Sequence, residues 1–237
     1  MDNIELAMQE EQKYIQDKLN GIQTSLLNRL NLFGYTTLDA YFKDKKQYHF
    51  NNWKPNFYPV DIKDASIALE TAIKNNKTGV WYTYSDGLYA FHGSDEIDYD
   101  LCSKIGIVIA DMDYKGGTII GGPNDLGIEF LVPREVEMYP NDFMNKFYRI
   151  IKKYFPNDEV IISGNDILLN NKKVLGSMTR SLSKISVWAA QLSFDNHQET
   201  INLICNKKST KDPGYMDKNI LSRDIVLKEV SEWLQKA

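Results

Sequence analysis

The chain has 237 residues and is 43% hydrophobic, so it can bury one large core or two modest ones, and its length favours one domain with an appendage. Its formal net charge of -4 argues against a nucleic-acid partner whose affinity comes from phosphate contacts. No run approaches the roughly 18 to 20 apolar residues of a membrane span, and the acidic start from Met1 to Glu5 is unlike a secretory leader. We therefore expect a cytoplasmic protein without a membrane partner.

The cysteines and histidines give no sign of a metal site. Cys102 and Cys205 lie in different segments without a Cys-x-x-Cys spacing, and the histidines at His49, His92 and His197 are scattered. We expect free thiols and no metal held by the protein alone. A cysteine nucleophile stays open as an alternative, although neither cysteine has a histidine close to it in the sequence.

The N-terminal segment from 3 to 32 is rich in Glu, Gln, Lys and Leu and carries an apolar stripe, formed by Ile15, Leu19, Ile22 and Leu26. This spacing predicts a long amphipathic helix. Such a helix packs either on its own domain or against the same helix of a second copy in a homodimer. We assign residues 1 to 60 to an N-terminal helical arm and aromatic loop, and residues 61 to 237 to the main domain.

Residues 43 to 59 interleave lysines with aromatic side chains. Taken alone, this pattern is typical of a surface that stacks bases and binds phosphates. Because the whole chain is acidic, we expect instead a loop that docks its aromatic side chains on the core.

The next segment predicts a helix and then a hairpin. Asp64 or Ser66 is the expected cap of the helix. Two strands rich in aromatic residues, at 80 to 84 and 88 to 91, are joined by a Ser-Asp-Gly turn, which is a strong hairpin signal.

The remainder of the chain alternates helices and strands. We expect helices at 99 to 105, 143 to 154 and 223 to 233, and strands at 107 to 110, 118 to 120, 126 to 132, 159 to 162 and 185 to 194. Helices alternating with antiparallel hairpins predict an α+β fold, in which helices pack on one face of a mixed or antiparallel sheet.

The clearest chemical signal is a predicted pair of strands joined by a tight turn at Asn170-Asn171, since asparagine tolerates the left-handed backbone of a two-residue turn. Lys172 and Lys173 follow the turn. Adjacent residues of a strand face opposite sides of a sheet, so one lysine should face solvent and the other the packed or concave side. An inward lysine needs a partner, such as Asp166 or a bound anion. The alternative is a plain surface hairpin with two solvated lysines.

Two stretches with glycine can bring backbone close to a ligand. Gly176 and Ser177 follow the lysines on the same strand. Residues 115 to 127 contain two glycine pairs, and exposed amides in such a loop bind anions. Glycine pairs also serve ordinary strand turns, so this loop alone is not specific.

Together these stretches resemble the lipoate-protein ligase branch of the biotin/lipoate ligase superfamily. That family's Asn-Asp element, followed by a lysine, two residues and a glycine, is similar to Asn165-Asp166-Ile167 followed by Lys173-Val174-Leu175-Gly176-Ser177. The strand that runs into its glycine-rich ligand loop is similar to Ile105-Gly106-Ile107-Val108 followed by Lys115-Gly116-Gly117. The start of its first helix is similar to Ala68-Leu69-Glu70. The resemblance covers the chain from Ile67 to Phe194.

This resemblance implies a catalytic sheet that binds ATP and lipoate or a related carboxylic acid. The acid and ATP would be joined as an acyl-AMP with release of pyrophosphate, and the acyl group would pass to a lysine of an acceptor protein domain. Mg²⁺ would accompany the triphosphate. Lys173 would be the catalytic residue, next to the carboxylate and the α-phosphate. The ligand- and nucleotide-binding residues would be Lys115, Gly116, Gly117, Asn165, Asp166, Gly176 and Ser177.

Two departures from the family's pattern keep a second function open. The family has an arginine pair ahead of a triple glycine, whereas this chain has Asp111 and Asp113 in that region, and the family's His-Asp pair is replaced by Gly121-Gly122. An adenylate phosphate would lose cationic partners there. The alternative is a non-catalytic ligand- or protein-binding protein that keeps the ligase scaffold.

Overall fold

The computed structural model describes residues 53 to 92, 97 to 111, 118 to 136, 140 to 205 and 212 to 236. The predicted N-terminal helix and its role in a homodimer lie outside these residues and stay predictions. Within the described part of the chain, no helix is long and apolar enough to cross a membrane.

The described elements follow one another in this order: β1 (Phe57–Asp61), α3 (Ile62–Lys74), β2 (Gly79–Tyr84), β3 (Tyr89–His92), α4 (Tyr99–Lys104), β4 (Val108–Asp111), β5 (Ile119–Gly121), β6 (Leu126–Pro133), a 3-10 turn (Arg134–Val136), α5 (Pro140–Tyr154), β7 (Val160–Ser163), β8 (Asp166–Leu169), β9 (Lys172–Ser181), β10 (Ile185–Leu192), α6 (Gln198–Ile204) and α7 (Arg223–Lys236).

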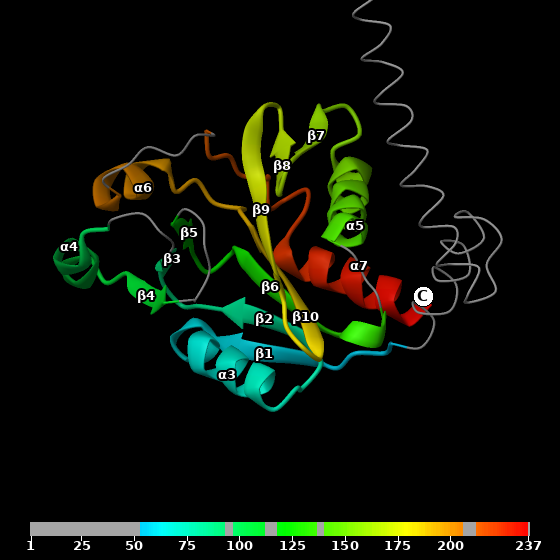
Figure 1. Ribbon diagram of the computed structural model, residues 1–237. Coiled ribbons are helices and arrows are strands. Elements are labelled where there is room, and N and C mark those ends of the chain that lie inside the picture. The colour runs from blue at the N-terminus through cyan, green and yellow to red at the C-terminus, as the bar shows by residue number, and fades with distance from the viewer. Residues whose placement is uncertain (1–52, 93–96, 112–117, 137–139, 206–211, 237) are drawn as a thin grey trace, which may run out of the picture. The chain divides into compact units, whose positions relative to one another are not determined.

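The large sheet has seven strands in the order β1-β2-β6-β10-β9-β8-β7 (Figure 1). β1 and β2 run parallel, and the other neighbouring strands of this sheet run antiparallel. β10 lies near the centre of the sheet and is paired along its length with β6 on one side and with β9 on the other. The predicted α+β fold with a mixed sheet is therefore confirmed.

One face of the large sheet carries an aromatic core beneath α5 and α7. Phe130 of β6 and Trp188 of β10 lie side by side on this face, with ring centroids 5.6 Å apart. Phe143 and Phe147 of α5 stack on Trp188, at centroid distances of 4.9 and 5.3 Å. Trp233 of α7 reaches Phe130 at 6.4 Å. The two phenylalanines are one helical turn apart, so a single face of α5 contacts the sheet.

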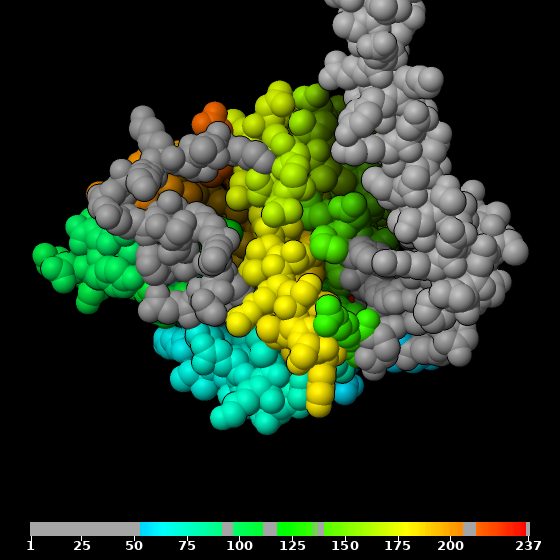
Figure 2. All heavy atoms as spheres, viewed as in Figure 1, coloured from blue at the N-terminus to red at the C-terminus, as the bar shows by residue number. Residues whose placement is uncertain are grey.

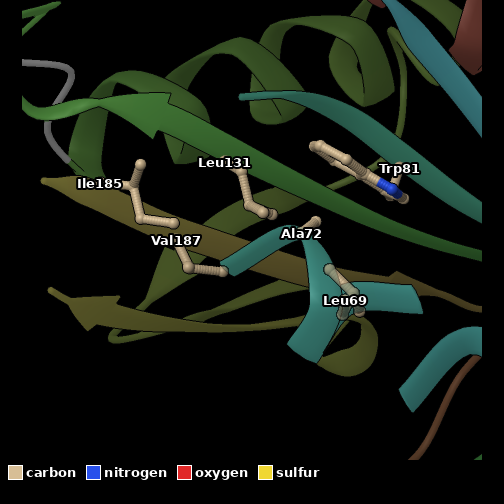
Figure 3. Close-up of a cluster of buried hydrophobic side chains, with 6 residues drawn as sticks. All are labelled: Leu69, Ala72, Trp81, Leu131, Ile185 and Val187. Carbon is tan, nitrogen blue, oxygen red and sulfur yellow. The ribbon is translucent and has the colours of Figure 1, made fainter. Parts of the chain in front are cut away.

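The opposite face of the sheet is covered in part by α3. Leu131 follows Phe130 on β6, and Val187 precedes Trp188 on β10. Neighbouring residues of a strand face opposite sides, so Leu131 and Val187 point away from the aromatic core. They pack with Leu69 and Ala72 of α3 and with Trp81 (Figure 3). Helices thus cover both faces, and the prediction that they lie on one face is wrong. The periodicity of a helix shows which of its sides is apolar, but not which face of a sheet receives that side.

A second, smaller sheet places β3 between β4 and β5. The predicted hairpin between residues 80 to 84 and 88 to 91 is wrong, because β2 pairs with β1 and β6 whereas β3 pairs with β4 and β5. The Ser-Asp-Gly segment does bend the chain locally, and the Ser85 hydroxyl accepts a hydrogen bond from the Gly87 amide at 3.2 Å. A local turn signal predicts a reversal but does not decide which strands pair after it.

Two local details also differ from the sequence prediction. The cap of α3 is Asp61, whose carboxylate accepts a hydrogen bond from the Lys63 amide at 2.9 Å, instead of Asp64 or Ser66. The end of the expected aromatic loop forms β1, where Tyr58 stacks on Trp81 with ring centroids 4.7 Å apart. Both differences follow from the parallel pairing of β1 with β2, a long-range contact that local propensity does not contain.

Replacing Phe147 tests the aromatic core. Its ring is fully buried between the sheet and α5, so we expect Phe147→Ala to lower the free energy of unfolding by about 3 to 5 kcal/mol through lost burial and a residual cavity. Urea denaturation measures this change. Arg149→Ala, at an exposed position of the same helix, is the matched control and should leave stability nearly unchanged. A loss below about 1 kcal/mol for Phe147→Ala would contradict this description of the core.

Candidate functional site

The turn between β8 and β9 has the backbone expected from its asparagines. Asn170 and Asn171 both have positive φ, 51° and 64°. The Asn170 side chain accepts a hydrogen bond from the Glu159 amide at 3.1 Å and donates one to the Asp158 carboxylate at 2.8 Å. The hairpin is therefore tied to the segment that precedes β7.

A β-bulge in this hairpin determines where Lys173 points. Ile167 pairs with Leu175 and Leu168 pairs with Lys173, so Val174 has no partner on β8. In a regular strand, residues three apart face opposite sides. The extra residue cancels this alternation and puts Lys173 on the same face as Gly176. The neighbouring lysine, Lys172, is exposed, so the prediction that the two lysines face different sides is confirmed.

The Lys173 side chain lies across Gly176 and meets Asp166. Its ammonium is 3.0 Å from the Asp166 carboxylate, and the two side chains are 29% and 16% exposed. A Cβ at position 176 would come within 2.7 Å of Lys173 Cε and 2.8 Å of its Nζ. Gly176 is paired directly with Asp166. The glycine thus provides the space in which the lysine reaches its partner.

The backbone of Lys173 is held from its second side by the segment from 212 to 214. The Lys173 amide donates to the Asp212 carbonyl at 2.9 Å, and the Gly214 amide donates to the Lys173 carbonyl at 2.8 Å. The carbonyl of the bulged residue, Val174, accepts a hydrogen bond from the Ser193 amide at 3.0 Å. The bulge is therefore hydrogen-bonded on its outer edge as well as against β8.

The other residues singled out in the sequence take different positions. The Asn165 carbonyl accepts hydrogen bonds from the Ser177 amide at 2.8 Å and from the Ser177 hydroxyl at 2.9 Å. The same hydroxyl lies 3.2 Å from the sulfur of Met144 on α5. The Ser177 side chain is thus on the face opposite to Lys173. The expected ligand-loop residues Lys115, Gly116 and Gly117 lie outside the described residues and stay predictions.

A row of small and polar residues crosses the sheet next to Lys173. Gly176 pairs with Gln191, which pairs with Gly127 on its other side. A Cβ at position 127 would lie 2.5 Å from the Thr83 hydroxyl and 3.1 Å from Gln191 Oε1. The Gln191 amide nitrogen donates to the Tyr89 hydroxyl at 2.9 Å. Sequence reasoning missed Gln191, because only the pairing of three strands brings it beside Gly176.

A single carboxyl group, Glu129, is buried on the same face of β6, two residues beyond Gly127. It is 3% exposed, and its Oε2 atom has no hydrogen-bond partner among the described residues. Burial raises the pKa of Glu129 to about 8, since the charged form loses its hydration. The group is therefore mostly neutral at pH 7. One acid inside the apolar run from Leu126 to Val132 was the sequence signal for it.

A second carboxylate, Asp125, is buried in a hydrogen-bonded cluster at the end of the small sheet. Its Oδ1 accepts from the Phe194 and Asp195 amides at 2.6 and 3.2 Å. Its Oδ2 accepts from the Gly122 amide at 2.7 Å and lies 2.5 Å from His197 Nε2. These contacts use both oxygens of the carboxylate, so Asp125 acts as a structural link between chain segments.

The described residues do not bring together a group of three or more His, Cys, Asp or Glu side chains that could hold a metal ion. The described thiols are both free. Burial raises the pKa of the Cys102 thiol, which lowers its thiolate fraction and disfavours it as a nucleophile.

Replacing Glu129 tests the buried acid through the pH dependence of stability. Its folded-state pKa of about 8 lies above the usual 4.5, so between these values the folded protein holds a proton that the unfolded chain has lost. Wild-type stability should therefore fall as pH rises through this window, by about 1.4 kcal/mol per pH unit from this group. We expect Glu129→Gln to lose this contribution, so that its stability relative to the wild type increases up to about pH 8 and then levels off.

Urea denaturation at pH values spanning about 5 to 9 measures this difference. Glu70→Gln, at an exposed position of α3, is the matched control and should follow the wild type at every pH. Parallel curves for the wild type and Glu129→Gln would show that Glu129 does not titrate as described.

No protein-family model matches the sequence, and neither does any curated protein sequence. The fold, in contrast, matches several solved structures. LipL1 of P. falciparum in complex with lipoate superposes with a TM-score of 0.62 at 12% identity, over 77% of this chain and 63% of that chain. This chain thus spans less than two thirds of that protein's length.

Two further structures match over most of their own length. Lipoate-protein ligase A bound with ATP has a TM-score of 0.61 at 15% identity, over 78% of this chain and 85% of that chain. The bi-partite lipoate protein ligase of Thermoplasma acidophilum, solved in a study of that ligase and its E2 lipoyl domain, has a TM-score of 0.60 at 13% identity, over 78% and 84%. Likenesses at such low identity establish the fold alone, and the resemblance predicted from the sequence is confirmed at that level: this chain has the fold of the lipoate-protein ligases.

Proposed function

We propose that the protein is a diverged lipoate-protein ligase-like enzyme. It activates a carboxylic acid, lipoate or a related one, with ATP to give an acyl-AMP and pyrophosphate. It then transfers the acyl group to a lysine amine of an acceptor protein, with release of AMP. The observation that carries this proposal is the half-buried Lys173 ammonium, held over Gly176 by Asp166. It lies on the inner face of the large sheet, which we define as the face that α3 covers in part.

A lysine in this position suits the first half of the reaction. In that step a carboxylate oxygen attacks the α-phosphorus of ATP and pyrophosphate leaves, so the reactants are anions and negative charge develops on the phosphate. A positioned ammonium in a partly desolvated site stabilises that charge. Asp166 holds the Lys173 side chain at 3.0 Å, which fixes the direction of the ammonium before a ligand arrives.

The solved structures supply the rest of the support. One is a protein in complex with lipoate, one is a ligase bound with ATP, and one was studied together with its E2 lipoyl domain. We extend these three to the present chain as acid, nucleotide and acceptor. Mg²⁺ in nucleotide sites keeps several waters and uses one or two carboxylates together with the phosphates. The described residues bring together no group of three acidic, histidine or cysteine side chains that could hold the ion, so its ligands would come mostly from the triphosphate and water.

The acidic residues in the region preceding the glycine loop support a second candidate, a non-catalytic protein that binds a ligand or another protein on the same scaffold. Asp111 and Asp113 stand where the ligase pattern has cations. Such a protein could bind an acid or an adenylate without turning it over. Binding with no pyrophosphate exchange distinguishes it from the enzyme.

Replacing Lys173 tests the proposed chemistry. We expect Lys173→Ala to lower acid-dependent exchange of label between pyrophosphate and ATP by about 100- to 1000-fold, because one charged contact in the transition state is lost. Lipoate, octanoate and biotin are the acids to assay. Lys172→Ala removes the exposed lysine beside it while leaving the turn intact, so it should keep wild-type exchange.

Two results would count against this assignment. Equal losses for Lys172→Ala and Lys173→Ala would indicate a general effect on the hairpin. No exchange by the wild type with any of the acids, despite a thermal shift with lipoyl-AMP, would favour the binding protein.

Replacing Gly176 tests the position of the lysine without removing its charge. A Cβ there would displace the end of the Lys173 side chain, and a flexible side chain can move at little energetic cost. We therefore expect Gly176→Ala to reduce the exchange rate by at least about tenfold while changing the unfolding free energy by less than about 1 kcal/mol. Gly87→Ala is the matched control, because no heavy atom lies within 4 Å of its added Cβ. Full activity in Gly176→Ala would show that the lysine need not lie over this position.

A further inference from the structure

Two buried polar side chains on the inner face of the large sheet have atoms without a partner. Glu129 is 3% exposed and Gln191 is 4% exposed. Glu129 Oε2 and Gln191 Oε1 accept no hydrogen bond from the described residues. Buried polar groups in folded proteins are nearly always satisfied, by protein, water or ligand. Each atom therefore needs a buried water or a group of a ligand as its partner.

The strand register places the two groups close together. Gln191 is paired with Gly127, and Glu129 lies two residues further along β6, on the same face. Glu129 is itself paired with Ala189 of β10 on one side and with Trp81 of β2 on the other. Gly127 and Ala189 are the small residues that separate Glu129 from Gln191, so no bulky side chain of these strands stands between them.

The free atom of Gln191 is an acceptor. Its amide nitrogen donates to the Tyr89 hydroxyl at 2.9 Å, which assigns the oxygen to the other side, 3.1 Å from the Cβ position of residue 127. Burial raises the pKa of Tyr89, so the phenol keeps its proton and its place in this network. Glu129 also accepts hydrogen bonds through its carbonyl oxygen, whether or not the carboxyl is ionised.

The direction from the lysine to these acceptors is across the strands. Lys173 lies on β9 over Gly176, Gln191 is the next residue in the row on β10, and Glu129 is on β6. Two steps between neighbouring strands span about 10 Å. Phe91 lies beside this path, 3.4 Å from the Cβ position of residue 127. An acid with its carboxylate at Lys173 would run past an aromatic ring before reaching Glu129.

We propose that Glu129 and Gln191 form a specificity site that accepts hydrogen bonds from an N–H group at the far end of the carboxylic acid substrate. The preferred acid then carries an amide, ureido or ammonium group, and a wholly apolar tail is disfavoured. This inference rests on the proposed function, since it assumes that Lys173 receives the carboxylate. A site built to bond a polar group discriminates strongly against an analogue that lacks it, because its buried acceptors are left unpaired.

The test compares matched acids by ligand-dependent thermal shift on the full chain, a readout that does not require turnover. Octanoate and 8-aminooctanoate share a chain and differ in the terminal N–H group, biotin offers a neutral ureido group, and lipoate has an apolar end. We expect the wild type to bind 8-aminooctanoate or biotin at least about 100-fold more tightly than octanoate. Tighter binding of 8-aminooctanoate would indicate that the site prefers an ammonium group, and tighter binding of biotin would indicate that it prefers a neutral N–H donor.

Variants at Glu129 and Gln191 assign the preference to these side chains. Glu129→Leu and Gln191→Leu should each abolish the preference and leave octanoate binding equal or better. Glu129→Gln keeps the volume and one carbonyl acceptor but cannot ionise. It should therefore retain biotin, and it should lose 8-aminooctanoate because the bound ammonium draws the proton off the wild-type carboxyl and pairs with the carboxylate. Glu70→Leu, at an exposed position of α3, should behave as the wild type.

The outcomes separate the two proposals. If lipoate or octanoate binds the wild type as tightly as the N–H-bearing acids, or if Glu129→Leu and Gln191→Leu keep the wild-type preference, this inference is overturned while the ligase-like function stands. The acceptors are then satisfied by buried water only. If none of the acids shifts the unfolding temperature in the presence or absence of ATP, both proposals fail together.

Discussion

The alternation of side chains along β10 is the constraint on which the rest of the structure depends. Trp188 and Gln191 are an odd number of residues apart, so they point to opposite faces of a strand that is paired on both edges. Trp188 holds α5 in the aromatic core, and Gln191 lies in the polar row beside Gly176. A slip of one residue would exchange these faces, placing an amide in the core and an indole in the site. The same register therefore maintains both the core and the site.

The position of Lys173, on which the proposed chemistry depends, is set by one β-bulge in this regular sheet. The unpaired Val174 turns Lys173 toward Asp166, and hydrogen bonds from the 212 to 214 segment and from Ser193 hold the bulge from outside. Bulges often occur where a strand must aim a side chain. In Figure 2 the yellow atoms of β9 lie in the middle of the face in view, and this strand carries several exposed or half-buried residues. β9 is thus paired within the sheet and also reaches the surface of the molecule.

Local chemistry made some features predictable. The Asn170-Asn171 turn follows from backbone preference, and the helix from 143 to 154 follows from its periodicity. Features that depend on distant pairing were not predictable: β2 and β3 separate into different sheets, and Gln191 comes beside Gly176 only through strand register. The direction of Lys173 was open for the same reason, because a bulge leaves no mark in the residue types around it.

The link made by Asp125 has a consequence for how the domain can open. One carboxylate joins the turn after β5 to the chain that leaves β10, through the Gly122 and Phe194 amides, and to His197 at the start of α6. Separating these segments would expose a charge that has lost all its partners. One side chain therefore ties the two sheets together at this end. Opening the domain at this end therefore requires several hydrogen bonds of one carboxylate to break together.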